Sequence, residues 1–316
     1  MAARSLSALF RTRNRALARE IAALERALEM PSTVLIVGES GTGKDHLARA
    51  LHEGSSRGAR PFVRIDAANL SDELFESEMF GHERGAFTGA VAATMGLLEA
   101  AGSGTAYLNE VSSLSPAAQA KLLRVLQEKT FRRLGGTDSH AFDARLIVSS
   151  RRDLSALVEQ GLFRPDLFYR IDVVSLRLPR LAERSEDILP LARSFLKRAA
   201  RAFRRPARRF APDAEKTLLR HSWPGNIREL LHVVERAVLT SSQAVVAPGD
   251  LPAGAFGSPQ SILAAAVEKR WTLRELSDVY IEETLRRAGG NRTLAAKRLG
   301  VSRKALWERG RKKTRK

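Results

Sequence analysis

The most informative segment of the chain reads Val34-Leu35-Ile36-Val37-Gly38-Glu39-Ser40-Gly41-Thr42-Gly43-Lys44. An apolar run of strand length passes into a glycine-rich loop, and a helical pattern follows over residues 44–52. Such a loop turns backbone N–H groups toward phosphates, the helix N-terminus adds its positive dipole end, and Lys44 reaches the β and γ oxygens. The alternative is a tight turn that merely needs glycine. The strand–loop–helix context predicts nucleotide binding by Gly38, Glu39, Ser40, Gly41, Thr42, Gly43, Lys44 and Asp45.

Strand and helix patterns alternate on both sides of this segment. Apolar runs of strand length occupy residues 33–37, 61–65, 105–108 and 145–149, and helical patterns occupy residues 44–52 and 116–128. The alternation predicts an α/β fold, a mainly parallel sheet with helices on both faces. Beyond Pro179 the patterns are helical, which predicts a small second subdomain. Apolar residues at helical spacing also predict one amphipathic helix from Leu6 to Met30.

Charge and composition limit the classes of function. Among 316 residues, 53 Lys and Arg stand against 35 Asp and Glu, for a formal net charge of +18. This excess predicts an anionic partner, with nucleic acid ahead of a membrane and a solvated basic surface as the alternative. The lack of cysteine excludes disulfides, thiolate metal sites and a cysteine nucleophile. Because no apolar run approaches the roughly 18 residues of a membrane span, we expect a cytoplasmic protein with no membrane partner.

A second segment with nucleotide chemistry is the apolar strand that ends in Asn109 and Glu110. Ligands of open α/β sheets bind at the carboxyl ends of the strands. A carboxylate at that edge can orient or deprotonate the water that attacks a γ-phosphate, and this predicts a catalytic role for Glu110. The preceding position normally carries an aspartate that holds Mg²⁺, whereas the neutral amide of Asn109 is a weaker ligand.

The most specific motif reads Glu78-Met79-Phe80-Gly81-His82-Glu83-Arg84-Gly85-Ala86-Phe87-Thr88-Gly89-Ala90. Its last six residues match without a change the signature loop of bacterial enhancer-binding proteins, the AAA+ ATPases that activate sigma-54 RNA polymerase. The chain resembles this family over most of residues 34–309. A loop of small residues with one exposed aromatic ring and one hydroxyl suits contact with another protein. The alternative is an ordinary glycine turn with Phe87 in the core.

The resemblance implies the fold, cofactors and partners of that family. It implies an AAA+ P-loop parallel sheet with a helical lid subdomain, followed by an all-α domain with a Fis-type helix–turn–helix. ATP and Mg²⁺ are the implied cofactors, and the implied partners are sigma-54 RNA polymerase, enhancer DNA and further copies of the chain in a ring, with a hexamer expected. The implied sigma-54 contacts are Gly85, Ala86, Phe87, Thr88, Gly89 and Ala90.

Three arginines also match family positions. Arg164 and Arg170 fall where the family has arginine fingers that reach the nucleotide of the neighbouring subunit. A planar, permanently charged guanidinium suits the charge on a transferring phosphoryl group. Arg228, in the segment Trp223-Pro224-Gly225-Asn226-Ile227-Arg228, matches the lid arginine that contacts the nucleotide of its own subunit. The alternative for each arginine is a surface ion pair.

The chain departs from the family around the γ-phosphate. It has Asn109-Glu110 for Asp-Glu, Ser150-Arg151 for Thr-Asn, and Asp66 for an asparagine at the end of the second strand. Asp45 also replaces the Ser or Thr that usually follows the lysine of a phosphate-binding loop. One hypothesis is that Mg²⁺ arrives with the nucleotide and that Asp66, with Asp45, partly replaces the missing ligand. The other is a chain that binds ATP but hydrolyses it slowly or not at all, beside a competent partner subunit.

The predicted organisation has five parts. They are an N-terminal helical segment (1–30), the nucleotide-binding subdomain (31–179), the lid (180–243), a proline- and glycine-containing linker (244–270) and a helix–turn–helix domain with a basic tail (271–316). The third helix of the last part is expected in the DNA major groove. The predicted DNA contacts are Arg292, Thr293, Ser302, Arg303, Lys304 and Trp307.

The leading prediction is therefore a sigma-54-dependent transcriptional activator that binds enhancer DNA and remodels the closed promoter complex with ATP. A second alternative is an AAA+ motor that acts on nucleic acid itself. The residues between Gly85 and Ala90 argue against that motor, because none is basic. With no phosphoacceptor or ligand-sensing domain before Met30, we expect control in trans by a repressor or co-activator protein.

Overall fold

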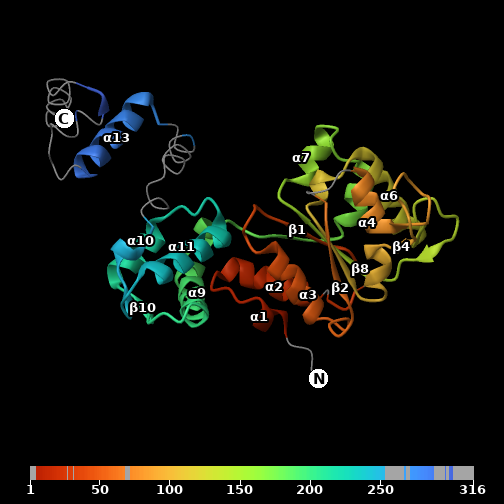
Figure 1. Cartoon of the computed structure of the whole chain (residues 1–316), viewed down its shortest axis with the longest axis horizontal. Coiled ribbons are helices and arrows are strands. Elements are labelled where there is room, and N and C mark those ends of the chain that lie inside the picture. The colour runs from red at the N-terminus through yellow and green to blue at the C-terminus, as the bar shows by residue number, and fades with distance from the viewer. Residues whose placement is uncertain are drawn as a thin grey trace. The chain divides into compact units, whose positions relative to one another are not determined.

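The computed structural model describes residues 5–26, 28–30, 32–67, 72–252, 267, 271–287, 296 and 299–301. The chain divides into two compact units, residues 1–251 and 252–316 (Figure 1). The first unit contains a parallel sheet with its helices and a helical lid. In the second unit, α13 (Leu273–Arg287) is described as a helix. The six predicted DNA contacts, Arg292, Thr293, Ser302, Arg303, Lys304 and Trp307, lie outside the described residues.

The first unit is built on a five-stranded sheet with the order β2-β5-β8-β1-β9, in which all neighbouring strands are parallel. This confirms the predicted α/β architecture. The first strand along the chain, β1, lies between β8 and β9. Because all neighbouring strands are parallel, their carboxyl ends share one edge of the sheet. The strands are β1 (Val34–Val37), β2 (Phe62–Asp66), β5 (Thr105–Asn109), β8 (Arg145–Ser150) and β9 (Val174–Arg177).

Side chains alternate between the two faces of the sheet and build two separate cores. Leu35, Leu108 and Val148 belong to one core, whereas Ile36 and Tyr107 belong to the other. Because successive side chains of a strand point to opposite faces, strands that are apolar throughout require helices on both sides. The near-continuous apolar runs read from the sequence are explained by this double burial.

Helices cover both faces, as Figure 1 shows for α2 and α3 on one side and α4, α6 and α7 on the other. Leu17 and Ile21 of α2 and Leu47 of α3 pack on the strands. The helices of this subdomain are α1 (Leu6–Leu9), α2 (Arg15–Arg26), α3 (Lys44–Glu53), α4 (Asp72–Phe80), α5 (Leu97–Ala101), η1 (Val111–Ser113), α6 (Pro116–Glu128), α7 (Leu154–Glu159) and α8 (Pro165–Ile171). Two short hairpins project from it, β3 (Gly81–His82) with β4 (Thr94–Met95) and β6 (Thr130–Phe131) with β7 (His140–Ala141).

The lid is helical, as predicted. Its α11 buries an apolar stripe that includes Leu230, Val234 and Val238, and it packs on α9. Trp223, which is 1% exposed, anchors the loop before α11. The lid elements are η2 (Leu181–Asp187), α9 (Ile188–Ala202), β10 (Arg209–Phe210), α10 (Pro212–Arg220), α11 (Asn226–Thr240), β11 (Val245–Val246) and η3 (Pro248–Asp250).

The prediction of one N-terminal helix from Leu6 to Met30 is wrong. The structure has two helices, α1 and α2, separated at residues 10–14. α1 ends at Leu9, and α2 starts anew after Asn14, whose side-chain oxygen accepts from the Leu17 N–H at 3.0 Å and caps the second helix. Asp187 of the lid accepts hydrogen bonds from the Thr12 hydroxyl and the Arg13 N–H. The break therefore ties the N-terminal segment to the lid.

In the part of the chain that the structure describes, none of the helices is both long and apolar enough to cross a membrane.

Candidate functional site

The glycine-rich loop leaves the end of β1 and enters α3 in the manner of a phosphate-binding loop. Gly41 and Gly43 have φ values of 79° and 105°, a region that favours glycine. The Lys44 side chain is 6% exposed, and its ammonium donates to the carbonyl oxygens of Gly38 at 2.7 Å and Glu39 at 3.2 Å. The loop thus holds a buried cation at its centre, where an anionic phosphate is stabilised.

The lid closes over this loop through several contacts. The Ile227 N–H donates to the Gly41 carbonyl at 2.9 Å, and the Arg228 guanidinium donates to the Ser40 hydroxyl at 2.8 Å. Buried Arg184 donates to the Thr42 carbonyl. The structure therefore brings predicted residue Arg228 to the phosphate-binding loop. Arg184 was not singled out from the sequence, because a basic residue in a basic chain carries no distinguishing pattern.

Gly41→Ala is expected to damage the junction between loop and lid. A Cβ at this position lies 2.4 Å from the Gly225 carbonyl oxygen, and the φ of 79° is strained for alanine. We expect a loss of about 1–3 kcal/mol in the free energy of unfolding and weaker ATP binding. Thermal unfolding and calorimetric titration check this. Gly249→Ala is the control, since no atom lies within 4 Å of its Cβ; equal losses in the two variants contradict the prediction.

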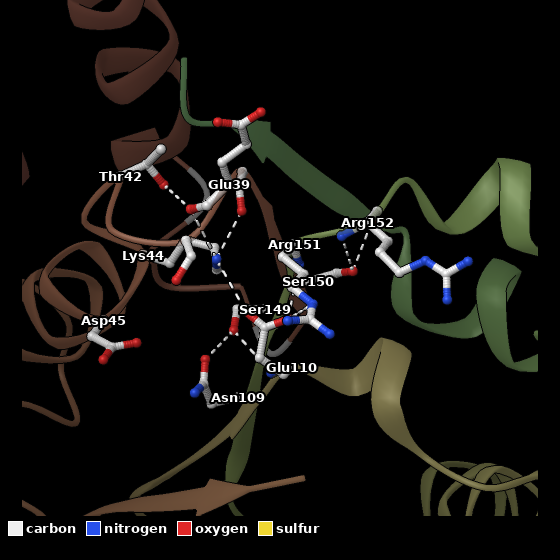
Figure 2. A network of polar contacts seen from close by, with 12 residues as sticks. Glu39, Thr42, Lys44, Asp45, Asn109, Glu110, Ser149, Ser150, Arg151 and Arg152 are labelled. Atoms are coloured by element: carbon white, nitrogen blue, oxygen red, sulfur yellow. Dashed lines mark hydrogen bonds and ion pairs between the residues drawn. The ribbon is translucent and has the colours of Figure 1, made fainter. Parts of the chain in front are cut away.

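Glu110 faces Lys44 at the carboxyl edge of the sheet (Figure 2). The two side chains form an ion pair at 3.1 Å, and Glu110 is 14% exposed. The other carboxylate oxygen accepts the Arg151 N–H at 3.1 Å, while the Arg151 guanidinium lies 3.9 Å away. Glu110 itself has a φ of 62°, which turns its side chain out of the strand direction. A carboxylate within 3.1 Å of the phosphate-binding lysine is positioned to act on a water beside a γ-phosphate.

Asn109 is held by its neighbours on the sheet. The register pairs Asn109 with Asp66, and the Asn109 amide donates to the Asp66 carboxylate at 2.6 Å. The Asn109 carbonyl oxygen accepts the Ser149 hydroxyl at 2.7 Å. The two positions at which this chain exchanges asparagine and aspartate relative to the family are therefore direct partners at the ends of neighbouring strands.

Arg64 was missed by sequence reasoning and lies between the two aspartates of the site. Its guanidinium pairs with Asp66 at 2.9 and 3.0 Å and with Asp45 at 2.7 Å. Burial tends to raise the pKa of Asp66, but hydrogen bonds from Arg64 and Asn109 outweigh it and hold this pKa below its ordinary value. Burial raises the pKa of Tyr107, so its hydroxyl stays protonated and donates to Asp45 at 2.7 Å.

The two predicted finger arginines lie on α8, and their hydrogen bonds go elsewhere than the phosphate-binding loop of the same chain. Arg164 pairs with Asp166 at 2.7 Å, and Arg170 donates to the Leu126 carbonyl at 2.8 Å. Arg164 occupies the N-cap position of α8, and Arg170 lies in the last turn of that helix. Their role at a neighbour's nucleotide stays a prediction.

The loop from Gly85 to Ala90 is a compact, exposed turn. The Gly85 N–H donates to the Ala90 carbonyl at 2.9 Å, which closes the turn at its base. At its tip Phe87 is 45% exposed and meets the His82 ring edge-on, with 5.0 Å between ring centroids. Phe87 therefore does not fill the core, contrary to the alternative drawn from the sequence.

A second hairpin, β6 with β7, supports this loop, and no sequence pattern indicated it. Arg133, beside β6, pairs with Glu83 at 3.0 Å and with Glu99 at 3.0 Å. Gly135 packs directly on Ala86 with a φ of 72°, so a Cβ there meets the Ala86 methyl at 2.8 Å. These contacts fix the base of the loop while its tip stays accessible.

Three family descriptions match successive parts of the chain. Residues 10–177 match the Sigma-54 interaction domain, residues 182–265 the AAA+ ATPase lid domain, and residues 272–312 the bacterial regulatory protein, Fis family. The first alone spans more than half of the chain.

Curated proteins and solved structures agree with these matches. The transcriptional regulatory protein ZraR of Klebsiella oxytoca is 45% identical over 275 residues, covering 87% of this chain and 62% of that protein. The alginate biosynthesis transcriptional regulatory protein AlgB of Pseudomonas aeruginosa is 41% identical over 294 residues, covering 91% of this chain and 64% of that protein. The chain thus spans less than two thirds of the length of these relatives.

Among solved structures, NtrX from Brucella abortus in complex with ATP matches with a TM-score of 0.71 and 34% identity, over 97% of this chain and 69% of that one. The same protein in complex with ADP matches with a TM-score of 0.69 and 36% identity, over 94% of this chain and 67% of that one. With its phosphate-binding loop, lid and unchanged signature loop, the chain belongs to the family of AAA+ transcriptional activators that carry the sigma-54 interaction domain.

Proposed function

We propose that the chain activates sigma-54 RNA polymerase by binding and hydrolysing ATP within a ring of subunits, with a hexamer as the expected assembly. The observation that carries the proposal is the combination, in one compact unit, of a lysine-bearing phosphate loop with a facing carboxylate and the exposed loop of residues 85–90. The NtrX structures with ATP and ADP support nucleotide binding by this fold.

The residues around Lys44 supply the elements of phosphoryl transfer to water. In this proposal Lys44 holds the terminal phosphates, Arg228 contacts them from the lid, and Glu110 orients the attacking water. The Lys44–Glu110 ion pair must open when a phosphate enters, since the phosphate takes the place of the carboxylate at the ammonium. Mg²⁺, when bound with the nucleotide, supplies positive charge to the phosphates.

The positions of the two arginines at the start and in the last turn of α8 support a ring. Neither Arg164 nor Arg170 bonds to the phosphate-binding loop of its own chain, and both are suited to the charge on a neighbour's γ-phosphate. A site completed by a second copy makes turnover depend on assembly.

Two segments of the chain, the loop of residues 85–90 and residues 272–312, support the proposed partners. The tip residues Phe87 and Thr88 are exposed and uncharged, which favours contact with the protein sigma-54 over contact with nucleic acid. The Fis family match at residues 272–312 supports binding to enhancer DNA. Contacts of the predicted residues there, from Arg292 to Trp307, are part of this proposal.

A second candidate is a nucleotide-binding regulator with weak or absent hydrolysis that works beside a competent subunit. The observation in its favour is Asn109, a neutral amide whose oxygen already accepts the Ser149 hydroxyl. An amide is a poorer ligand than a carboxylate for a hard cation.

ATP turnover measured over a range of protein concentrations separates the two candidates. We expect turnover per subunit to rise cooperatively with concentration, because Arg164 and Arg170 act on the neighbour. Arg164→Ala is expected to abolish this rise, whereas Arg193→Ala, which removes an exposed lid arginine paired with Glu215, leaves it intact. ATP binding without turnover at any concentration favours the second candidate.

A further inference from the structure

The oxygen donors that would hold a divalent cation in this site are already engaged. Both Asp66 oxygens accept hydrogen bonds from Arg64, and one of them also accepts from the Asn109 amide. One Asp45 oxygen accepts from Arg64 and the other from the Tyr107 hydroxyl. In Figure 2 no dashed line joins Asp45 to Lys44. Among the described residues, no group of three or more His, Cys, Asp or Glu side chains converges to hold a metal.

The site also lacks a charged ligand where the family has its aspartate. Asn109 offers an amide oxygen, and that oxygen accepts the Ser149 hydroxyl. Divalent Mg²⁺ demands near-ideal octahedral geometry from hard oxygen ligands. Asp45 and Asp66 already share one guanidinium, and the Asn109 oxygen contacts the Ser149 hydroxyl at 2.7 Å and the Tyr107 hydroxyl at 3.1 Å, so this set does not fit that demand.

Arg64 occupies the position between these acids as a permanent cation. It reaches Asp66, two residues along the same strand, with two parallel bonds and reaches Asp45 on α3 with a third. A guanidinium never loses its charge near neutral pH, and its planar fork matches carboxylates with two bonds at once. One positive charge thus serves two carboxylates, and one of them belongs to Asp45, the residue that follows Lys44.

We propose that Arg64 substitutes for a protein-held divalent cation, so that this chain binds ATP with the same affinity whether or not Mg²⁺ is present. The proposal rests on the nucleotide site of the proposed function. Arg64 offsets the negative charge of Asp45 and Asp66 that would otherwise repel a triphosphate. Any Mg²⁺ in the complex is then carried by the phosphates alone, and the aspartates do not ligate it.

The test is calorimetric titration of the full chain with the non-hydrolysable analogue AMP-PNP, in Mg²⁺ and in EDTA. For the wild type the two dissociation constants are expected to agree within about threefold. Arg64→Gln unmasks the two aspartates, so binding in EDTA is expected to weaken at least about tenfold, with Mg²⁺ restoring it. Arg64→Lys keeps the charge and is expected to retain binding in EDTA.

Two further variants serve as controls, one for the loss of an exposed arginine and one for misfolding. Arg124→Gln removes another exposed, ion-paired arginine, on α6, and is expected to behave as the wild type. Adding Asp45→Asn to Arg64→Gln removes one of the unmasked charges and is expected to recover binding in EDTA, which a misfolded protein cannot do.

Each remaining outcome overturns a stated claim. Wild-type binding that requires Mg²⁺ refutes the substitution by Arg64 and favours Asp45 and Asp66 as magnesium ligands. Arg64→Gln that binds as tightly in EDTA as the wild type also refutes it. Failure to bind AMP-PNP under both conditions removes the nucleotide site itself, and with it the proposed function.

Discussion

Glu110→Gln is expected to lower ATP turnover by about 10²–10⁴-fold while ATP remains bound. The glutamine keeps the size of the side chain but cannot accept a proton from the attacking water. Because Glu110 forms an ion pair with Lys44 at 3.1 Å, its removal also frees the ammonium for phosphate. ATP affinity is therefore expected to stay the same or rise. Steady-state turnover and calorimetric titration measure the two quantities.

Glu76→Gln is a closely matched control. Glu76 is 15% exposed and pairs with Lys121, so it resembles Glu110 in exposure and in partner. If Glu76→Gln reduces turnover as much as Glu110→Gln, the loss reflects damage to the fold. If Glu110→Gln keeps full turnover, Glu110 is not the residue that acts on water.

Phe87→Ala is expected to reduce activation of a sigma-54 promoter by at least about 30-fold, without changing ATP turnover in the absence of polymerase. Aromatic residues at the centre of an interface commonly contribute about 2 kcal/mol or more to binding, and Phe87 is 45% exposed at the tip of its loop. Its ring contacts only the His82 ring edge-on among the aromatic residues described. In vitro transcription and turnover assays give the two readouts.

The comparison variant is Phe203→Ala, which removes a phenylalanine of 39% exposure at the end of α9. It is expected to leave activation intact. A parallel loss of activation and of basal turnover in Phe87→Ala contradicts a role confined to the polymerase.

The order of strands and helices could be predicted because double burial leaves a direct trace in the sequence. Strands covered on both faces are apolar throughout, and glycine marks the loop that needs positive φ. The helix at residues 116–128 was predicted with its observed bounds, since Ser115 caps it and Pro116 begins it. Strand β9, by contrast, lies at the end of the strand order and buries only Leu176, so no apolar run marks it in the sequence.

The contacts between distant segments could not be predicted. The helical spacing from Leu6 to Met30 hides the break at residues 10–14, where Thr12 and Arg13 donate hydrogen bonds to Asp187 of the lid. Arg64 alternates with apolar neighbours as any exposed strand residue does, and its significance appears only when Asp45 and Asp66 meet it. Periodicity indicates which face of a strand or helix a residue occupies. It carries no information on which charged residue from another element contacts it.

The exchange at Asp66 and Asn109 could be predicted in part. The sequence placed each residue at the end of a strand, and the parallel register joins them as a pair. The hydrogen bond of 2.6 Å between them shows why the exchange is tolerated in the fold, since one carboxylate and one amide still face each other.

Open-complex formation at a sigma-54 promoter, with purified chain, sigma-54 RNA polymerase and ATP, tests the central claim most directly. The account predicts that open complexes form with ATP, fail to form with AMP-PNP, and fail to form with Phe87→Ala. A promoter that stays closed with the wild-type chain and ATP, while the same polymerase opens it with an established sigma-54 activator, contradicts it.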